Sequence, residues 1–411
     1  MNDANPTMEF LVEEVRRWLR REPPTEKISP DVDPALFIDI VRRNRLQPLM
    51  ATRLSGRQSA PWEAALRQGE LAYQASLIHA YRHLAAGTRL AAEMERAGIR
   101  CLALRGPFFG LNLYEDAGVR AFTDIDLLIP VARRRQALDV AHAAGYGVSG
   151  RLLPLRFFER HHLHWRLENP VDAVVCELHW ALDHPYKPFA VDYDAIFDQS
   201  EIRATEGYRW REPQPGHLLI AAGMHAAKHC RVGRDYAESP GFLGHVIKAG
   251  WMTHWLDVLA ILRKHGARLD WDVIIGEARA WGVEESLVTA MAGAARIMGA
   301  SVPESVLGRL AAIPRPPAPG GERTRPLGQR RGIGRIAAMG GFRAECLRDA
   351  WAYVLAKDRG IRGNAAVRPM KRAVYAVGAC VRLGIAAVET AGFFVAAMLR
   401  DRIATRDRST D

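Results

Sequence analysis

Two aspartates one residue apart stand at the start of an apolar segment and could together hold a divalent cation. Asp124 and Asp126 open the run Asp124–Pro130, which we predict to be a strand stopped by proline. Because side chains alternate along a strand, both carboxylates point to the same face. Carboxylate oxygens suit Mg²⁺, which can neutralise a polyphosphate and activate an attacking hydroxyl in nucleotidyl transfer. The pair alone is a weak motif, because Asp-x-Asp occurs by chance in many chains.

A site for two cations needs a third carboxylate on a neighbouring strand, and Glu177 is the candidate. It lies in the segment Val174–Trp180, which follows the turn at Asn169-Pro170 and reads as a strand. On such a strand Val175 and His179 share the face of Glu177. The alternative is that Glu177 is a solvated acid near a strand end.

Arg105 and Gly106 form a turn between a short apolar run and a predicted helix. A glycine allows close backbone approach, a helix start presents N–H groups, and arginine is a permanent forked cation. We therefore predict that the turn contacts phosphate groups. The alternative for Arg105 is a structural ion pair.

Further along the chain, His225 and Lys228 are predicted to line the cleft opposite the carboxylates, where Lys228 could contact a phosphate. His225 and His229 are one helical turn apart, a spacing that can bind zinc, but no glutamate follows His225 as in His-Glu-x-x-His. We expect no dedicated zinc site there or at the histidines of 161–164. For His229 a place in the core or at the surface is expected.

The elements that must position these residues follow from the apolar spacing. The first hundred residues and the part beyond Pro213 have helical spacing, whereas short apolar runs bounded by turns lie between them. This predicts an α+β fold, with a small mixed β-sheet flanked by helices. The predicted regions are a helical N-terminal region (1–98), an α/β core (99–212), a helical domain completing the cleft (213–313), a Pro/Gly/Arg linker (314–337) and a basic helical C-terminal region (338–411).

Three motifs resemble a known family: Leu104-Arg105-Gly106-Pro107, the run Arg120–Pro130, and Glu177-Leu178-His179-Trp180. They look like the motifs of the uncharacterised nucleotidyltransferase family in the DNA polymerase β-like superfamily. The segments His225–His229 and Trp255–Val258 are similar to that family's downstream half, so the resemblance covers about residues 35–300. It implies a nucleotidyltransferase core, two Mg²⁺ ions held by the three carboxylates, with Mn²⁺ as an alternative, and transfer of a nucleoside monophosphate from an NTP.

The sequence departs from the family pattern in two places. Pro107 stands where the superfamily often has serine, which removes a hydroxyl and an N–H donor, and Arg105 stands where the family commonly has lysine. A catalytically decayed binding or regulatory protein is therefore the alternative to a transferase. For an active enzyme we expect transfer to a hydroxyl or amine of a small molecule, peptide or protein, with release of pyrophosphate.

The net charge of +11 belongs to one part of the chain. Residues 315–411 hold 19 Lys/Arg and 8 Asp/Glu, which leaves 38 of each in residues 1–314. A neutral body argues against a polymerase that follows a nucleic-acid backbone. The basic tail predicts an adaptor role, or a peripheral contact, on anionic membrane or nucleic acid, although a solvated tail remains the alternative.

The location of the protein follows from its tail, its cysteines and its N-terminus. The apolar run Val374–Leu399 contains Arg382 and Glu389, which would each cost about 2.5–3.5 kcal/mol near a bilayer centre, so we predict a packing or interfacial helix. Five scattered cysteines form no Cys-x-x-Cys pair, and an acidic N-terminus without an apolar run does not resemble a secretion signal. These features predict a cytoplasmic protein that contacts membranes at most peripherally.

Overall fold

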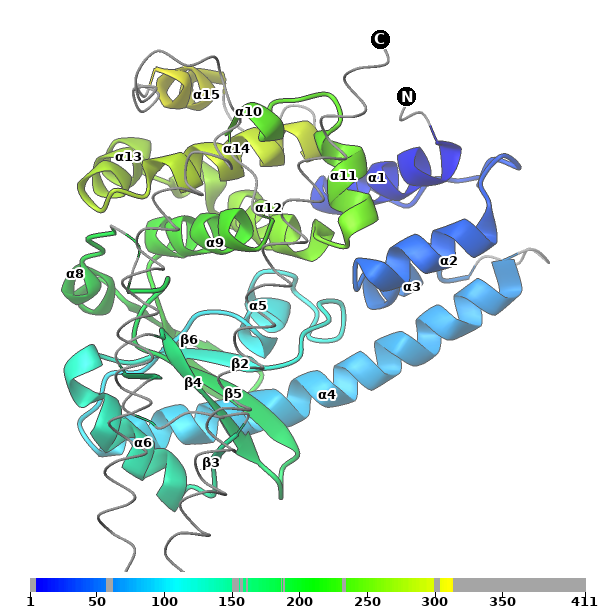
Figure 1. The fold of residues 1–411 in the computed structure, drawn as a ribbon. Coiled ribbons are helices and arrows are strands. Elements are labelled where there is room, and N and C mark those ends of the chain that lie inside the picture. Colours follow the sequence, from blue (N-terminus) through cyan, green and yellow to red (C-terminus); the bar gives the residue numbers. More distant parts are fainter. Residues whose placement is uncertain are drawn as a thin grey trace, which may run out of the picture. The chain divides into compact units, whose positions relative to one another are not determined.

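The structure is a computed structural model of the 411-residue chain (Figure 1). It describes residues 5–56, 62–149, 162–185, 189–230, 234–298 and 304–312, together with Leu155, Phe158, Glu159 and Lys187. The helices and strands discussed below belong to one compact unit. The predicted linker (314–337) and the basic C-terminal region (338–411) lie outside the described residues.

A five-stranded mixed sheet carries the predicted carboxylates. Its strands are, in spatial order, β1 (Leu102–Ala103), β2 (Ile125–Leu128), β5 (Val174–His179), β4 (His164–Asn169) and β3 (Gly147–Val148). β2 and β5 are parallel, and each other neighbouring pair is antiparallel. The α+β fold with a small mixed sheet, predicted from the sequence, is confirmed.

One face of the sheet is apolar and the other carries polar residues. Trp165 in β4 and Cys176 and Leu178 in β5 are buried, whereas the alternating residues His164 and Glu177 are half-buried. This alternation is the one expected of strands with one face against a core. The polar face is therefore the face available to a ligand.

The apolar face of β2 packs on the long helix α4 (Glu63–Arg96), which runs beside the sheet (Figure 1). Gly87 permits this contact, because a Cβ atom there would lie 3.1 Å from the Phe108 ring and 3.2 Å from Ile125 Cδ1. Ile125, which lies between the two aspartates in the sequence, points to the apolar face and is buried. Its burial turns Asp124 and Asp126 toward the polar face.

Helices precede, interrupt and follow the sheet. Those before it are α1 (Pro6–Leu19), α2 (Pro34–Arg43), α3 (Gln47–Leu54) and α4, and those within it are α5 (Pro107–Asn112), the short 3₁₀ helix η2 (Val131–Arg133) and α6 (Arg134–Ala143). After β5 come α8 (Tyr193–Asp198), the hairpin β6 (Glu201–Thr205) and β7 (Tyr208–Glu212), α9 (Pro215–Cys230), α10 (Arg234–Ala237), α11 (Phe242–Ala249), α12 (Met252–His265), η3 (Gly266–Arg268), α13 (Trp271–Ala280), α14 (Glu284–Met298) and α15 (Glu304–Ala311).

Local sequence explains several helix starts. The side chains of Asn5 and Asp33 accept hydrogen bonds from backbone N–H groups at the starts of α1 and α2, and a proline follows each of them. Asp192 and Asp270 cap α8 and α13 in the same way. None of the helices in the described part of the chain is long and apolar enough to cross a membrane.

Several elements differ from the expectation. The short apolar run before Arg105 forms only the two-residue strand Leu102–Ala103, with Leu102 opposite Leu128. Neither β3 nor the β6–β7 hairpin was predicted, because their short strands show weak apolar alternation. The two predicted region boundaries inside the described residues, after 98 and after 212, stay predictions.

Candidate active site

The turn at Gly106 leads from β1 into α5 and packs against the backbone at the start of β2. Gly106 has φ +77°, and a Cβ atom there would lie 2.6 Å from the carbonyl oxygen of Asp124 and 3.3 Å from Ile125 Cα. Only glycine combines this backbone conformation with so close an approach. Gly106 thus holds the turn against the backbone of Asp124, which places Arg105 beside the aspartates.

Asp126 and Glu177 occupy matching positions on the two parallel strands. Asp126 in β2 is the register partner of Glu177 in β5. Side chains at such positions point to the same face. Asp124 lies two residues before Asp126, immediately ahead of β2, and accepts a hydrogen bond from Thr123 Oγ1 at 3.1 Å. The structure therefore brings the three predicted carboxylates to one region of the polar face.

Arg105 is bound to Asp126 through both of its carboxylate oxygens. Arg105 Nη2 lies 2.9 Å from Asp126 Oδ1, and Arg105 Nε lies 3.2 Å from Oδ2. Both side chains are largely buried. Of the two interpretations that the sequence left open for Arg105, the ion pair is the one seen here. A role of Arg105 in binding phosphate stays a prediction.

The pKa values of the two aspartates are shifted in opposite directions. Burial raises the pKa of Asp124 to about 6, and the negative charges of Asp126 and Glu177 act in the same direction. Burial also opposes ionisation of Asp126, but Arg105 and the hydrogen bond from His179 outweigh it and hold the pKa of Asp126 well below its usual range. Without a cation, the ionised form of Asp126 is strongly stabilised by Arg105 and His179, whereas that of Asp124 is stabilised less, by Thr123 and Arg105.

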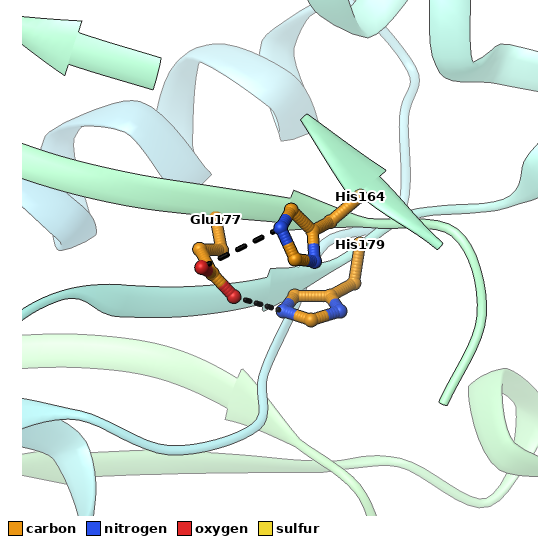
Figure 2. Close-up of side chains that lie close together, drawn as sticks. All are labelled: His164, Glu177 and His179. Carbon is orange, nitrogen blue, oxygen red and sulfur yellow. Dashed lines mark ion pairs between the residues drawn. The ribbon is translucent and has the colours of Figure 1, made fainter. Parts of the chain in front are cut away.

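Two histidines that were not predicted as site residues flank Glu177 (Figure 2). His164 Nε2 lies 3.4 Å from Glu177 Oε1, and His179 Nε2 lies 3.3 Å from Oε2. His179 Nε2 is also 2.9 Å from Asp126 Oδ1. His164 and His179 are register partners on antiparallel strands. The alternation of side chains along β5 places His179 on the face of Glu177. His164 can be placed there only from the pairing of β4 with β5.

These histidines differ in protonation. Burial would lower the pKa of His179, but its hydrogen bonds to Asp126 and Glu177 outweigh burial and raise it. Burial, reinforced by the neighbouring His179, lowers the pKa of His164, so His164 is neutral. His179 is thus a hydrogen-bond donor to the carboxylates, and His164 offers a neutral imidazole.

Lys228 and His225 come from α9. Burial and the positive charge of Arg105 lower the pKa of Lys228, while Asp183, Asp126 and Glu177 act in the opposite direction. The charges of these carboxylates thus act on the ammonium group, and a contact of Lys228 with phosphate stays a prediction. The His225 ring lies 4.3 Å from that of His229 and 4.9 Å from that of His254, between ring centroids. His225 thus lies in a cluster of histidine rings.

The comparisons with known proteins agree with this geometry. The sequence model of a family described as an uncharacterised nucleotidyltransferase matches residues 30–299. The chain belongs to this nucleotidyltransferase family. A search of curated proteins found no match. The matched span contains every predicted site residue of this nucleotidyltransferase family member and agrees closely with the span of 35–300 expected from the motifs.

In this nucleotidyltransferase family member the Gly106 turn is also tied to the helical half. Arg120 donates to both carboxylate oxygens of Asp257 in α12, at 2.7 Å each, and its Nη1 is 3.3 Å from the Gly106 carbonyl oxygen. Tyr114 Oη donates to Asp257 Oδ1 at 2.9 Å. These side chains are buried. In the sequence, Arg120 and Asp257 are recognisable only as parts of two motifs. Their ion pair cannot be predicted from local sequence, because 137 residues separate them.

The donor set fits hard divalent cations. Asp124, Asp126 and Glu177 present carboxylate oxygens to one face, and besides burial the negative charges of Asp126 and Glu177 raise the pKa of Asp124. A cation would relieve that repulsion. These three residues would hold the ions that the nucleotidyltransferase family is expected to use.

Proposed function

We propose that this protein is a Mg²⁺-dependent nucleotidyltransferase. It transfers a nucleoside monophosphate from an NTP to a hydroxyl or amine of a small molecule, peptide or protein. The observation that carries this proposal is the register of Asp126 opposite Glu177 on parallel strands, with Asp124 at the start of β2. Membership of the family supplies the reaction class.

The reaction replaces one bond to the α-phosphorus by another. The acceptor oxygen or nitrogen bonds to the α-phosphorus, the bond from that phosphorus to the bridging oxygen breaks, and pyrophosphate leaves with the electron pair. The acceptor proton passes to solvent or to a nearby carboxylate. Two Mg²⁺ ions, or Mn²⁺ in their place, would neutralise the polyphosphate and activate the acceptor when bound. Asp124, Asp126 and Glu177 hold and orient these ions.

The nucleotide contacts come from the groups beside the carboxylates. Arg105, which pairs with Asp126 here, would be free to donate to the triphosphate when a cation is bound at Asp126. The Gly106 turn brings backbone close to the phosphates, and Lys228 and His225 approach from α9. Pro107 contributes no N–H group, so the cationic side chains carry more of the phosphate binding.

An assay with labelled nucleotides tests this proposal. The full-length protein is incubated with each α-labelled NTP, Mg²⁺ and extracts or candidate acceptors, and label transfer and pyrophosphate are measured. Asp126→Asn should reduce turnover by at least about 100-fold, because it removes a shared cation ligand. Asp139→Asn, an exposed site on α6, is the matched control and should retain full activity.

The alternative is a nucleotide-binding protein without turnover. Two observations favour it: Arg105 already pairs with both oxygens of Asp126, and Pro107 removes a phosphate donor. Tight NTP binding that is unaffected by Asp126→Asn, with no pyrophosphate released from any NTP, would establish this alternative and reject the transferase.

A further inference from the structure

His164, Glu177 and His179 form a compact group of metal-binding side chains at the edge of the carboxylate site. Within the described part of the chain, one ligand atom from each of the three lies within 4.8 Å of the others. Figure 2 shows both imidazole rings directing a nitrogen at the carboxylate of Glu177. The carboxylate is thus held between two imidazoles that come from adjacent strands.

Two of the three separations in this group are close to those of ligands around one ion. Glu177 lies 3.4 Å from His164 Nε2 and 3.3 Å from His179 Nε2, measured to its nearest oxygens. Ligand atoms that bind one transition-metal ion at about 2.1 Å lie roughly 3 to 3.5 Å apart. Small side-chain adjustments would therefore complete the coordination, because the strand register already places the three residues together.

The donor types separate this group from the carboxylate pair. Mg²⁺ prefers oxygen ligands, whereas imidazole nitrogen suits later transition-metal ions such as Co²⁺ or Zn²⁺ better. Two histidines with one carboxylate form a donor set of the latter kind. Among the described residues, the Nδ1 atoms of His164 and His179 are buried and have no hydrogen-bond partner, so the polar contacts of both rings converge at Nε2.

We propose that His164, Glu177 and His179 bind a divalent transition-metal ion, so that one of the two cation positions is selective for such an ion over Mg²⁺. This inference rests on the proposed function, because Glu177 is also the third carboxylate of the nucleotidyltransferase site. Asp126, 2.9 Å from His179 Nε2, lies between this position and the position at Asp124. Mg²⁺ would then occupy the all-oxygen side.

Metal binding by the full-length protein tests the proposal independently of activity. After treatment with a chelator, the protein is titrated with Mn²⁺ at neutral pH, and bound Mn²⁺ is examined by pulsed electron paramagnetic resonance for coupling to ¹⁴N. The native protein should show two nitrogen couplings. His164→Gln and His179→Gln should each lose one coupling and bind Mn²⁺ at least roughly 10-fold more weakly, and Co²⁺ absorption bands should change in parallel.

The control is His142→Gln, the same chemical change at an exposed position on α6, which should leave affinity and couplings unchanged. Circular dichroism identifies a variant that fails to fold, and the other histidine variant then decides. Mn²⁺ bound without nitrogen coupling, and equally well by both variants, would overturn this inference and leave a two-Mg²⁺ enzyme intact. Absence of any Mn²⁺ or Mg²⁺ binding, with or without NTP, would overturn both proposals.

Discussion

Asp124 is the least compensated charge of the site. Its neighbours Asp126 and Glu177 repel its ionised form, and burial adds to this effect, so its pKa rises to about 6. Asp126, two residues away, is compensated by Arg105 and His179. The residue with the unfavourable charge is the one that would gain most from a cation, which is typical of sites where stability is given up for binding.

The substitution Asp124→Asn should stabilise the cation-free protein in a pH-dependent way. A raised folded-state pKa means that the Asp124 contribution to stability is fully present below about pH 4, the unfolded pKa, and is lost as pH rises to about 6. The gain from asparagine should therefore grow over this range and level off above it, at no more than about 3 kcal/mol. Urea unfolding from pH 4.5 to 7.5 measures it, and a gain independent of pH would contradict the assigned pKa.

At the scale of elements, the β1–β2 connection controls the site. The Gly106 turn touches the backbone of Asp124 and carries Arg105, while the parallel pairing of β2 with β5 aligns Asp126 with Glu177. The positions of Arg105 and Asp124 thus depend on this turn, and the position of Asp126 relative to Glu177 depends on the pairing of β2 with β5. A displacement of the turn would move Arg105 and Asp124 together.

Gly106→Ala should disturb this turn more than its strained backbone alone explains. The added methyl would lie 2.6 Å from the Asp124 carbonyl oxygen, whereas at Gly98, with φ +72°, it would meet nothing within 4 Å. Gly98→Ala should cost about 1–2 kcal/mol of stability through its backbone conformation. Gly106→Ala should cost more and also reduce turnover roughly 100-fold, since the carboxylate shifts. Equal effects in denaturation and turnover assays would show that the contact with Asp124 is unimportant.

At the scale of the whole molecule, buried ion pairs join the sheet region to the downstream helices. Arg120, which contacts the Gly106 carbonyl, pairs with Asp257 of α12, and Tyr114 shares the same carboxylate. On α9, the charges of Asp126 and Glu177 act on the pKa of Lys228. Through Arg120, α12 therefore supports the Gly106 turn beside the carboxylates. Contact of residues 338–411 with anionic membrane or nucleic acid stays a prediction.

Asp257→Asn should destabilise the protein by about 3–5 kcal/mol, because it leaves the buried Arg120 charge without its partner. Asp272→Asn removes an exposed ion pair with Arg309 and should cost less than about 1 kcal/mol. Guanidinium unfolding monitored by tryptophan fluorescence compares the two. A similar small loss in both variants would mean that the Arg120 pair does not hold the helices to the sheet.

Much of the site could be predicted from local sequence. Period-two alternation placed Asp124 with Asp126 and Glu177 with His179, and Gly106 indicated a tight turn, because these relations depend on neighbouring residues alone. Short strands such as β3, β6 and β7 were missed, because two to five residues of mixed polarity carry little periodic signal.

The tertiary structure determined which charged side chains pair and in which direction their pKa values shift. Arg120 meets Asp257 only because segments 137 residues apart pack together, and the contacts of Arg105 with Asp126 and of His164 with Glu177 depend on how neighbouring strands pair. The pKa of Asp124 likewise depends on distances and burial that no spacing reveals. The sequence by itself determined the residue types, their shared faces and the family; long-range packing determined which charges meet, since electrostatic interactions depend on separation in space rather than along the chain.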